Sequence, residues 1–344
     1  MLKKSTQLLN KIANKFDSED PLMIDLYRGF ASEERLYLKG RVLENEGVFL
    51  SEDQTRIRTL IDNFKRFESD EIEGARVKIK VRDHIFEVYS DEEGYFEVDE
   101  AWDTPLSPKE NRWIDSHAQL IDTMDLASDG VQANGEIFFP SVNADFGVIS
   151  DVDDTVLQTH ATSLFRLKMM YVTFFKDPYE RLPMDGIDKI YAALEKGSNG
   201  KKENPIFYVS NSPWNIHDNI ETFLEVNQFP KGPVLLRDAG IHLMTQTSKT
   251  WGHKMETISQ ILKTYPDLPF VMLGDTASKD ADHYLDLAKE FEGRVKAIYI
   301  RHTRNTRNAR RIANLVEANT DVNIVLVKNS DEIMEHAIIH GLVK

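Results

Sequence analysis

The chain has 344 residues, with 42 lysines and arginines against 57 aspartates and glutamates, so its formal net charge at pH 7 is −15. This charge argues against duplex nucleic acid as a partner, because a duplex-binding surface is basic. The absence of cysteine excludes disulfides and thiol chemistry. No stretch approaches the roughly 18 apolar residues of a membrane span, and the length predicts two domains.

Residues 1–20, MLKKSTQLLNKIANKFDSED, form an amphipathic basic segment. Leu2, Leu9, Ile12 and Phe16 fall on one helical face, and the lysines lie mostly off it. Polar residues interrupt any apolar region of a signal peptide, so we expect a cytoplasmic protein. The pattern suits a helix on an anionic membrane, but a helix packed on its own domain is favoured by periodicity alone. Peripheral membrane association therefore stays open.

Residues 21–145 are predicted to form a β-rich, sandwich-like accessory domain. Several segments show the period of two that strands require: LYLKGRVL, RVKIKV, HIFEVYS, GYFEV, WIDSHAQLID and GEIFFPS. The turn at residues 91–94 predicts a hairpin between HIFEVYS and GYFEV, and one helix is expected over residues 57–67. This half groups no catalytic residue types. We therefore expect a structural or partner-binding module whose partner is unknown.

From residue 146 to 344 the period changes, and short apolar runs alternate with helical stretches. The runs are FGVIS, PIFYVS, PVLLRD, PFVMLG, VKAIYI and NIVLV. This alternation predicts an α/β domain whose parallel sheet is covered on both faces. Ligands of such sheets bind beyond the carboxyl ends of the strands. We therefore expect functional side chains directly after the apolar runs.

Polar side chains stand at these points. They are Asp151 and Asp153 after FGVIS, Ser210 at the end of PIFYVS, Lys254 in the next helix, and Asp275 and Asp280 after PFVML. Each alone has an ordinary explanation, such as a solvated turn, a helix cap or a surface lysine. Their order, each in the right local context, favours an active site at which a doubly wound sheet brings them together.

These residue types suit phosphoryl transfer to a carboxylate. A nucleophilic aspartate approaches a dianionic phosphate only if a cation neutralises the encounter, and Asp151 with Asp275 would hold Mg²⁺, which prefers oxygen ligands. Lys254 would add a fixed positive charge, and the Ser210 hydroxyl would bind phosphate oxygens. Asp153, crowded by other acids, is expected to have a raised pKa and to serve as a proton donor.

Five stretches resemble the haloacid-dehalogenase (HAD) superfamily of aspartate-nucleophile phosphatases: GVISDVDDTVLQTHATS, NPIFYVSNSPWN, GPVLLRD, HKMETISQILKTYPDLPFVMLGD and AIYIR. More narrowly, residues 146–301 resemble the catalytic domain of the actin-patch phosphatidate phosphatase family. The β-rich half resembles the region that precedes this domain in bacterial members. The resemblance implies a HAD-like (Rossmannoid) α/β catalytic domain that follows the β-rich domain along the chain.

The resemblance also implies a role for each matching residue. Asp151 stands at the nucleophile and Asp153 at the general acid and base. The residues implied to bind Mg²⁺ are Asp151, Asp153 and Asp275. The residues implied to bind the phosphate are Ser210, Asn211 and Lys254, and Asp280 stands at a supporting acid.

The function expected is a Mg²⁺-dependent phosphatase of phosphatidate, or of a related lipid phosphomonoester at a membrane surface, that works through an aspartyl-phosphate intermediate. One alternative is a phosphatase of a soluble metabolite or a nucleic-acid end. Another is a non-catalytic adaptor with a vestigial phosphatase fold, against which the retained acids, Ser210 and Lys254 argue. Two segments bear on the substrate. The apolar stretch at 161–175 suits either a lipid surface or a buried helix. The arginine-rich run at 301–311 suits either an anionic surface or a solvated helix face.

Overall fold

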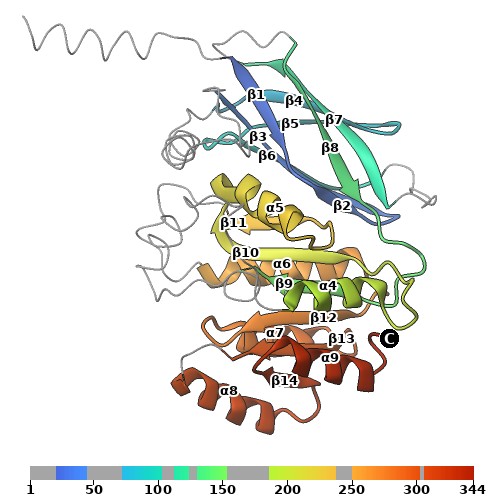
Figure 1. The fold of residues 1–344 in the computed structure, drawn as a ribbon. Helices are drawn as coiled ribbons and strands as arrows, with labels where there is room; N and C mark the ends of the chain where they lie inside the picture. The colour runs from blue at the N-terminus through green and yellow to red at the C-terminus, as the bar shows by residue number, and fades with distance from the viewer. Residues whose placement is uncertain are drawn as a thin grey trace, which may run out of the picture.

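The computed structural model describes residues 21–44, 72–102, 112–123, 130–152, 186–237, 250–302 and 306–344. Two sheets dominate it, one above the other in Figure 1. Several expectations fall outside the described residues. They are the amphipathic segment at 1–20, the helix at 57–67 and the apolar stretch at 161–175.

The first sheet is mixed and has eight strands: β1 (Leu22–Leu26), β2 (Gly29–Ala31), β3 (Arg35–Glu44), β4 (Arg76–Val81), β5 (His84–Tyr89), β6 (Tyr95–Ala101), β7 (Trp113–Asp122) and β8 (Gln132–Phe138). The strand order is β1-β3-β2-β8-β7-β4-β5, and β6 pairs with β3. Only β2 and β8 run parallel among these pairs of described strands. In β4, Val77, Ile79 and Val81 are buried, as the period of two predicts.

The predicted hairpin at residues 91–94 is wrong. The turn itself forms: Gly94 has a φ of 77°, and its N–H donates to the Asp91 carbonyl at 3.0 Å. However, β5 pairs with β4, and β6 pairs with β3. The Asp91 carboxylate accepts from the Tyr95 N–H at 2.9 Å, and the Arg41 guanidinium lies 4.8 Å from the centre of the Tyr95 ring. β6 thus pairs along its whole length with β3 and not with β5.

The second sheet is parallel throughout its described pairs. Its six strands are β9 (Gly147–Asp151), β10 (Ile206–Pro213), β11 (Val234–Arg237), β12 (Phe270–Asp275), β13 (Val295–Arg301) and β14 (Ile324–Val327). The order is β11-β10-β9-β12-β13-β14, so β9 lies inside the sheet. Each strand coincides with one of the six apolar runs, and the α/β prediction is confirmed.

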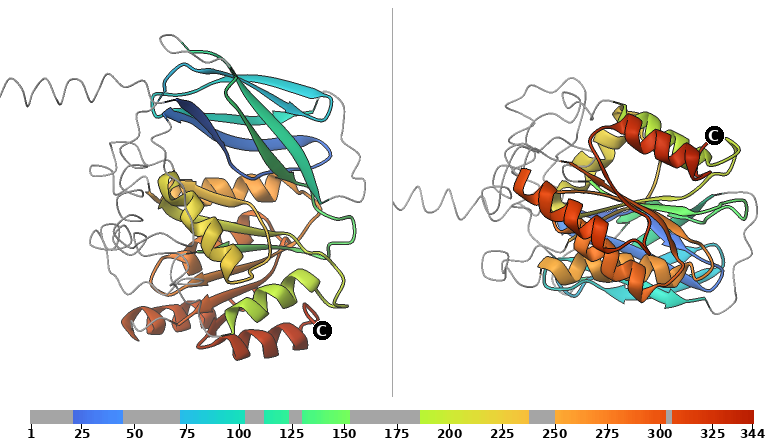
Figure 2. Two further views of the ribbon diagram at one scale, coloured as in Figure 1. Left: turned by 45° about the horizontal axis from the view of Figure 1, so that its top comes forward. Right: turned by 90° about the horizontal axis from the view of Figure 1, so that it is seen from below.

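Helices cover both faces of the parallel sheet, with α4 beside α9 on one and α6 beside α7 on the other (Figure 2). They are α4 (Ile187–Lys196), α5 (His217–Val226) after the short 3₁₀ helix η2 (Trp214–Ile216), α6 (Thr250–Thr264), α7 (Asp280–Glu290), α8 (Thr306–Ala318) and α9 (Ser330–Ile339). Within the described ranges, none of them combines the length and the apolar character needed to cross a membrane.

The buried apolar side chains form two cores. One lies inside the mixed sheet, where side chains of β3 and β4 such as Leu38 and Ile79 belong to one cluster. The other joins the two sheets: Phe30 of β2 packs edge-on against Phe207 of β10, with ring centroids 5.6 Å apart. The Tyr265 hydroxyl, just after α6, donates to the Ala31 carbonyl at 3.2 Å. The domain limits at residues 20 and 145 stay a prediction.

Candidate active site

Asp151 ends β9 at the middle of the carboxyl edge of the parallel sheet. The register pairs Asp151 with Val209 of β10 and Ser150 with Leu273 of β12. Ser210 therefore comes one position beyond Asp151 on the neighbouring strand. The structure thus brings together at one edge the strand ends that the sequence singled out.

Lys254 of α6 contacts two of the acids. Its Nζ lies 2.8 Å from Asp151 Oδ1 and 2.6 Å from Asp280 Oδ1, and the three side chains are no more than 4% exposed. Burial by itself lowers the pKa of Lys254, but the Asp151 and Asp280 carboxylates more than offset this and raise the pKa well above its usual value. The ammonium group is therefore charged at every physiological pH.

Backbone groups also hold the carboxylates of Asp275 and Asp280. Asp275, the last residue of β12, accepts from the N–H groups of Ala277 and, at 2.8 Å, Ser278. Asp280, the first residue of α7, accepts from the Asp275 N–H at 3.3 Å. This approach requires a glycine before Asp275, because a Cβ on Gly274 would lie 2.6 Å from the Asp280 side chain. The sequence TASK after Asp275 is thus a turn that orients both acids.

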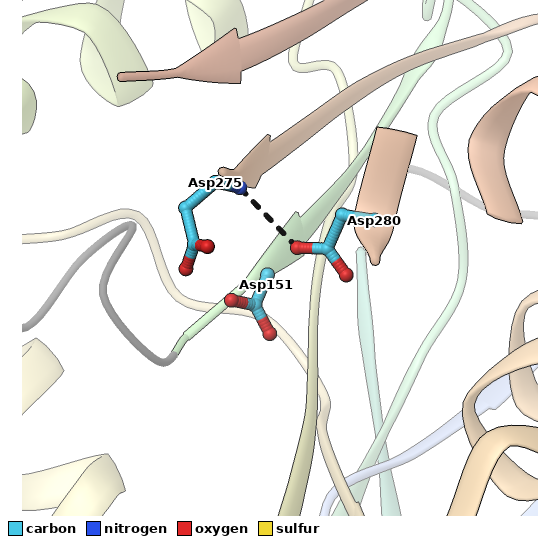
Figure 3. Close-up of side chains that lie close together, drawn as sticks. All are labelled: Asp151, Asp275 and Asp280. Atoms are coloured by element: carbon cyan, nitrogen blue, oxygen red, sulfur yellow. Dashed lines mark hydrogen bonds between the residues drawn. The ribbon is translucent and has the colours of Figure 1, made fainter. Parts of the chain in front are cut away.

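Figure 3 shows the carboxylates of Asp151, Asp275 and Asp280 turned toward one another. One oxygen from each lies within 4.8 Å of the others, and all three residues are buried. Buried like charges repel, and Lys254 offsets only part of their charge. A set of carboxylate oxygens is what Mg²⁺ prefers, so the donor chemistry fits this ion. Asp280, expected only as a supporting acid, belongs to the cluster, whereas Asp153 lies outside the described residues.

Ser210 and Asn211 lie in an irregular part of β10. Between Val209 and Pro213 the register with β11 shifts, and such a bulge redirects side chains. The Ser210 hydroxyl accepts from the Ser212 N–H at 2.9 Å. The Asn211 Oδ1 atom is buried and has no hydrogen-bond partner in the described part of the chain. A buried acceptor without a donor is unfavourable, and a bound ligand could supply the donor.

Two tyrosines that the sequence did not single out support the edge from behind. The Tyr191 hydroxyl of α4 contacts the Ser150 hydroxyl, next to Asp151. The Tyr284 hydroxyl of α7 donates to the Leu273 carbonyl at 3.1 Å. Aromatic residues on a helix face are so common in cores that no sequence signal distinguishes these two.

The arginine-rich run is only partly described. Arg311 of α8 makes a two-pronged ion pair with Asp282 of α7, with both N–O distances 2.9 Å. This arginine is thus engaged on the protein's own surface, which favours the solvated-face explanation at that position.

Residues 146–302 match the family described as "Phosphatidate phosphatase APP1, catalytic domain". Phosphatidate phosphatase APP1 of Saccharomyces cerevisiae is 31% identical over 161 residues, which cover 46% of this chain and 26% of the yeast protein. An uncharacterized protein of Schizosaccharomyces pombe is 24% identical over 218 residues, which cover 63% of this chain and 34% of that protein. The chain thus spans about a quarter to a third of the length of these relatives.

Among solved structures, a carbohydrate acetylesterase from Xanthomonas citri is 11% identical, with 81% of this chain and 68% of that chain covered. Its TM-score of 0.28 is too low to support any argument about fold. The family match, in contrast, begins just before β9, ends just after β13, and contains every residue of the site described above.

Proposed function

We propose that this chain is a Mg²⁺-dependent phosphatase of phosphatidate or a related lipid phosphomonoester, because residues 146–302 match the family of phosphatidate phosphatase catalytic domains. The observation that carries the proposal is the buried contact of Lys254 with Asp151 beside two more carboxylates. The parallel sheet with acids at its carboxyl edge supports a HAD-like assignment for this half.

In the proposed reaction, an Asp151 oxygen attacks the phosphorus atom and the bond to the lipid oxygen breaks. Asp153 protonates the leaving alkoxide, which leaves an aspartyl phosphate. Asp153 then takes a proton from water, which attacks the phosphorus and releases phosphate and the free Asp151 carboxylate. This use of one residue as acid and then base requires a pKa near the working pH, which neighbouring acids would provide for Asp153.

The positively charged groups make this encounter possible. When bound by Asp151, Asp275 and either Asp153 or Asp280, Mg²⁺ would supply positive charge that offsets the repulsion between a phosphate dianion and a carboxylate. Lys254 lies 2.8 Å from Asp151 and so would also lie against a phosphate in contact with that oxygen. Its raised pKa keeps this charge in place throughout the cycle.

The bulge of β10 would bind the remaining phosphate oxygens. The Ser210 hydroxyl, now an acceptor for the Ser212 N–H, can donate its own proton to a phosphate oxygen. Asn211 can donate from its amide nitrogen, and its buried Oδ1 would accept a hydroxyl of the substrate or of a metal-bound water. These contacts would orient the phosphorus atom for attack by Asp151.

A direct comparison of substrates tests the proposal. Phosphate release would be measured in Mg²⁺ on phosphatidate vesicles, glycerol 3-phosphate and a 5′-phosphorylated oligonucleotide, with Asp151→Asn as the blank. We expect phosphatidate to be hydrolysed fastest. A preference for glycerol 3-phosphate or the oligonucleotide would leave an aspartate-based phosphatase of another substrate. The absence of release from all three would favour the non-catalytic adaptor.

The amino-terminal segment offers a separate test of the membrane role. Deletion of residues 1–16 is expected to lower activity on phosphatidate vesicles, and to leave hydrolysis of a soluble aryl phosphate nearly unchanged. A matched variant, with Lys3, Lys4, Lys11 and Lys15 replaced by glutamine, keeps the apolar face but removes the charge. We expect the wild-type protein's vesicle binding to weaken with salt. Equal loss of both activities would show that the segment is structural.

A further inference from the structure

Trp214 lies one residue, Pro213, beyond the β10 bulge that is proposed to bind phosphate, and it packs against the mixed sheet. The Tyr27 ring, between β1 and β2, stacks on the Trp214 ring with centroids 4.4 Å apart and an angle of 23° between the planes. The His217 ring lies 4.5 Å from Tyr27 and 5.5 Å from Trp214. All three residues are at most 6% exposed. Trp214 is thus held by a residue of the other sheet.

A buried cation of the mixed sheet completes this contact. Lys39 of β3 is 6% exposed, and its Nζ lies 5.0 Å from the Tyr95 ring centroid and 5.8 Å from that of Trp214. A desolvated ammonium over aromatic faces is a favourable arrangement. Beside it, Arg28 joins the two halves by an ion pair with Glu221 of α5 at 3.0 Å. Stacking, charge and an ion pair all fix the mixed sheet against this corner.

The orientation of the indole ring depends on these ring contacts. The Trp214 Nε1 atom is buried and makes no hydrogen bond within the described residues, so no polar partner fixes the ring. Only Pro213 separates Trp214 from Ser212, whose N–H donates to the Ser210 hydroxyl. Proline restricts the backbone at this link. A shift of the indole would therefore move the bulge rather than be absorbed by a flexible connection.

We propose that the mixed sheet is a positioning part of the active site, in which Tyr27 and Lys39 hold Trp214 and thereby the bulge Ser210–Ser212. The inference rests on the proposed function, because it assigns phosphate binding to that bulge. It gives the β-rich half a role in the reaction that does not require a protein partner. A displacement of about 1 Å at a reacting group can cost about 100-fold in rate, so even a small relaxation of Trp214 would be measurable.

The test compares four full-length proteins: the wild type, Tyr27→Leu, Tyr27→Phe and Phe96→Ala. Tyr27→Leu keeps apolar bulk but removes the stacked ring, and Tyr27→Phe restores the ring. Phe96→Ala is the matched control, because Phe96 is 2% exposed but belongs to the separate core inside the mixed sheet. The measurements are kcat and KM for an aryl phosphate, inhibition by inorganic phosphate, and Tm.

We expect Tyr27→Leu to lower kcat/KM by about 10- to 100-fold and to weaken inhibition by inorganic phosphate, at a temperature at which the protein is folded. Tyr27→Phe is expected to restore kcat/KM and phosphate inhibition to within about 3-fold of wild type. Phe96→Ala is expected to lower Tm while kcat/KM and phosphate inhibition stay near wild type. Tyr27→Leu combined with Trp214→Leu should lose little more than Trp214→Leu alone, because coupled residues are not additive.

Each failure has a distinct signature. If Tyr27→Leu lowers Tm as Phe96→Ala does but retains wild-type kcat/KM and phosphate inhibition, the positioning role is wrong. Additive losses in the double variant would also overturn it. If the wild type releases no phosphate, or Asp151→Asn still does, the proposed function itself is wrong. Should Tyr27→Leu fail to fold, Lys39→Met removes the cation beside Trp214, and the same expectation applies to it.

Discussion

The carboxyl edge of the parallel sheet and the interface between the two sheets both hold charged groups, but they balance them differently. At the edge, three buried carboxylates lie around the single ammonium of Lys254. At the interface, Arg28 pairs with Glu221, and Lys39 lies 3.8 Å from Glu97 and over aromatic rings. The edge carries excess negative charge, whereas the interface pairs its charges.

This difference fits the proposed roles, with the edge carrying out the chemistry and the interface holding the structure around it. Like charges buried together cost stability, and they become favourable when a cation or proton joins them. Paired charges and stacked rings, by contrast, have their partners within the protein. We therefore expect changes at the edge to alter activity and ion binding more than folding. Changes of charge at the interface should alter the stability of the fold, and a change at Lys39 should also alter activity through Trp214.

The largest effect is expected from Asp151→Asn. The amide keeps the shape but removes the proposed nucleophile and one carboxylate of the cluster, so phosphate release should fall by about 10⁴-fold or more. The metal-free variant should unfold at the same or a higher Tm, because a crowded negative charge is gone. Phosphate release and thermal unfolding measure the two parts. Substantial remaining turnover would contradict the assigned nucleophile.

Asp153→Asn should be less severe and should depend on the leaving group. Loss of the acid and base is expected to cost about 10²- to 10⁴-fold on an alkyl phosphate. The loss should be smaller on an aryl phosphate, whose leaving group needs no proton. Parallel measurements of kcat on both substrates test this. Equal losses on the two would argue against Asp153 as the leaving-group acid.

Mg²⁺ binding should relieve the repulsion at the edge. At a concentration of about 100 times its Kd, the ion should add about 2.7 kcal/mol to the free energy of unfolding, and Asp275→Asn should reduce this gain. Ca²⁺, which accepts looser geometry, is expected to bind and to inhibit. Thermal unfolding of chelator-treated protein, with each ion added back, gives a measurement besides activity. Activity that survives complete metal removal would contradict the Mg²⁺ assignment.

The smallest expected effect is a pH dependence at the interface. Burial lowers the pKa of His217, but the charges of Glu221, Asp218 and Asp25 outweigh it and raise this pKa above its usual 6.5. The folded state thus binds the proton more tightly, so its stabilisation is complete below about pH 6.5 and is lost as pH rises through the folded pKa.

Thermal unfolding from pH 5 to 9 would compare the wild type with His217→Gln. As pH rises, the Tm of the wild type should fall relative to that of His217→Gln, because only the wild type loses a proton from His217. Both proteins keep the other nine of the chain's ten histidines, so the comparison cancels the titration of those nine. A difference that is constant across this range would contradict the raised pKa of His217.

Local pattern predicted most of the parallel sheet. Each apolar run became a strand because a strand buried on both faces is apolar at consecutive positions, and this holds whatever the neighbours are. The same reasoning predicted that Asp151 and Asp275 share one edge, because parallel strands end there, and Lys254 reaches that edge from helix α6. It failed at residues 91–94, where the turn forms but β6 pairs with β3 instead of β5, with Tyr95 packed against Arg41.

The sequence by itself determined the alternation of strands and helices, the acids at the strand ends, and the chemistry expected of such acids. These are local properties, set by side-chain type and by spacing along a few residues. Only the tertiary structure decided that Asp280 joins the carboxylate cluster and that Tyr27 stacks on Trp214. Those contacts join residues far apart in the chain, and they arise from the packing of one sheet against another rather than from any pattern in the sequence.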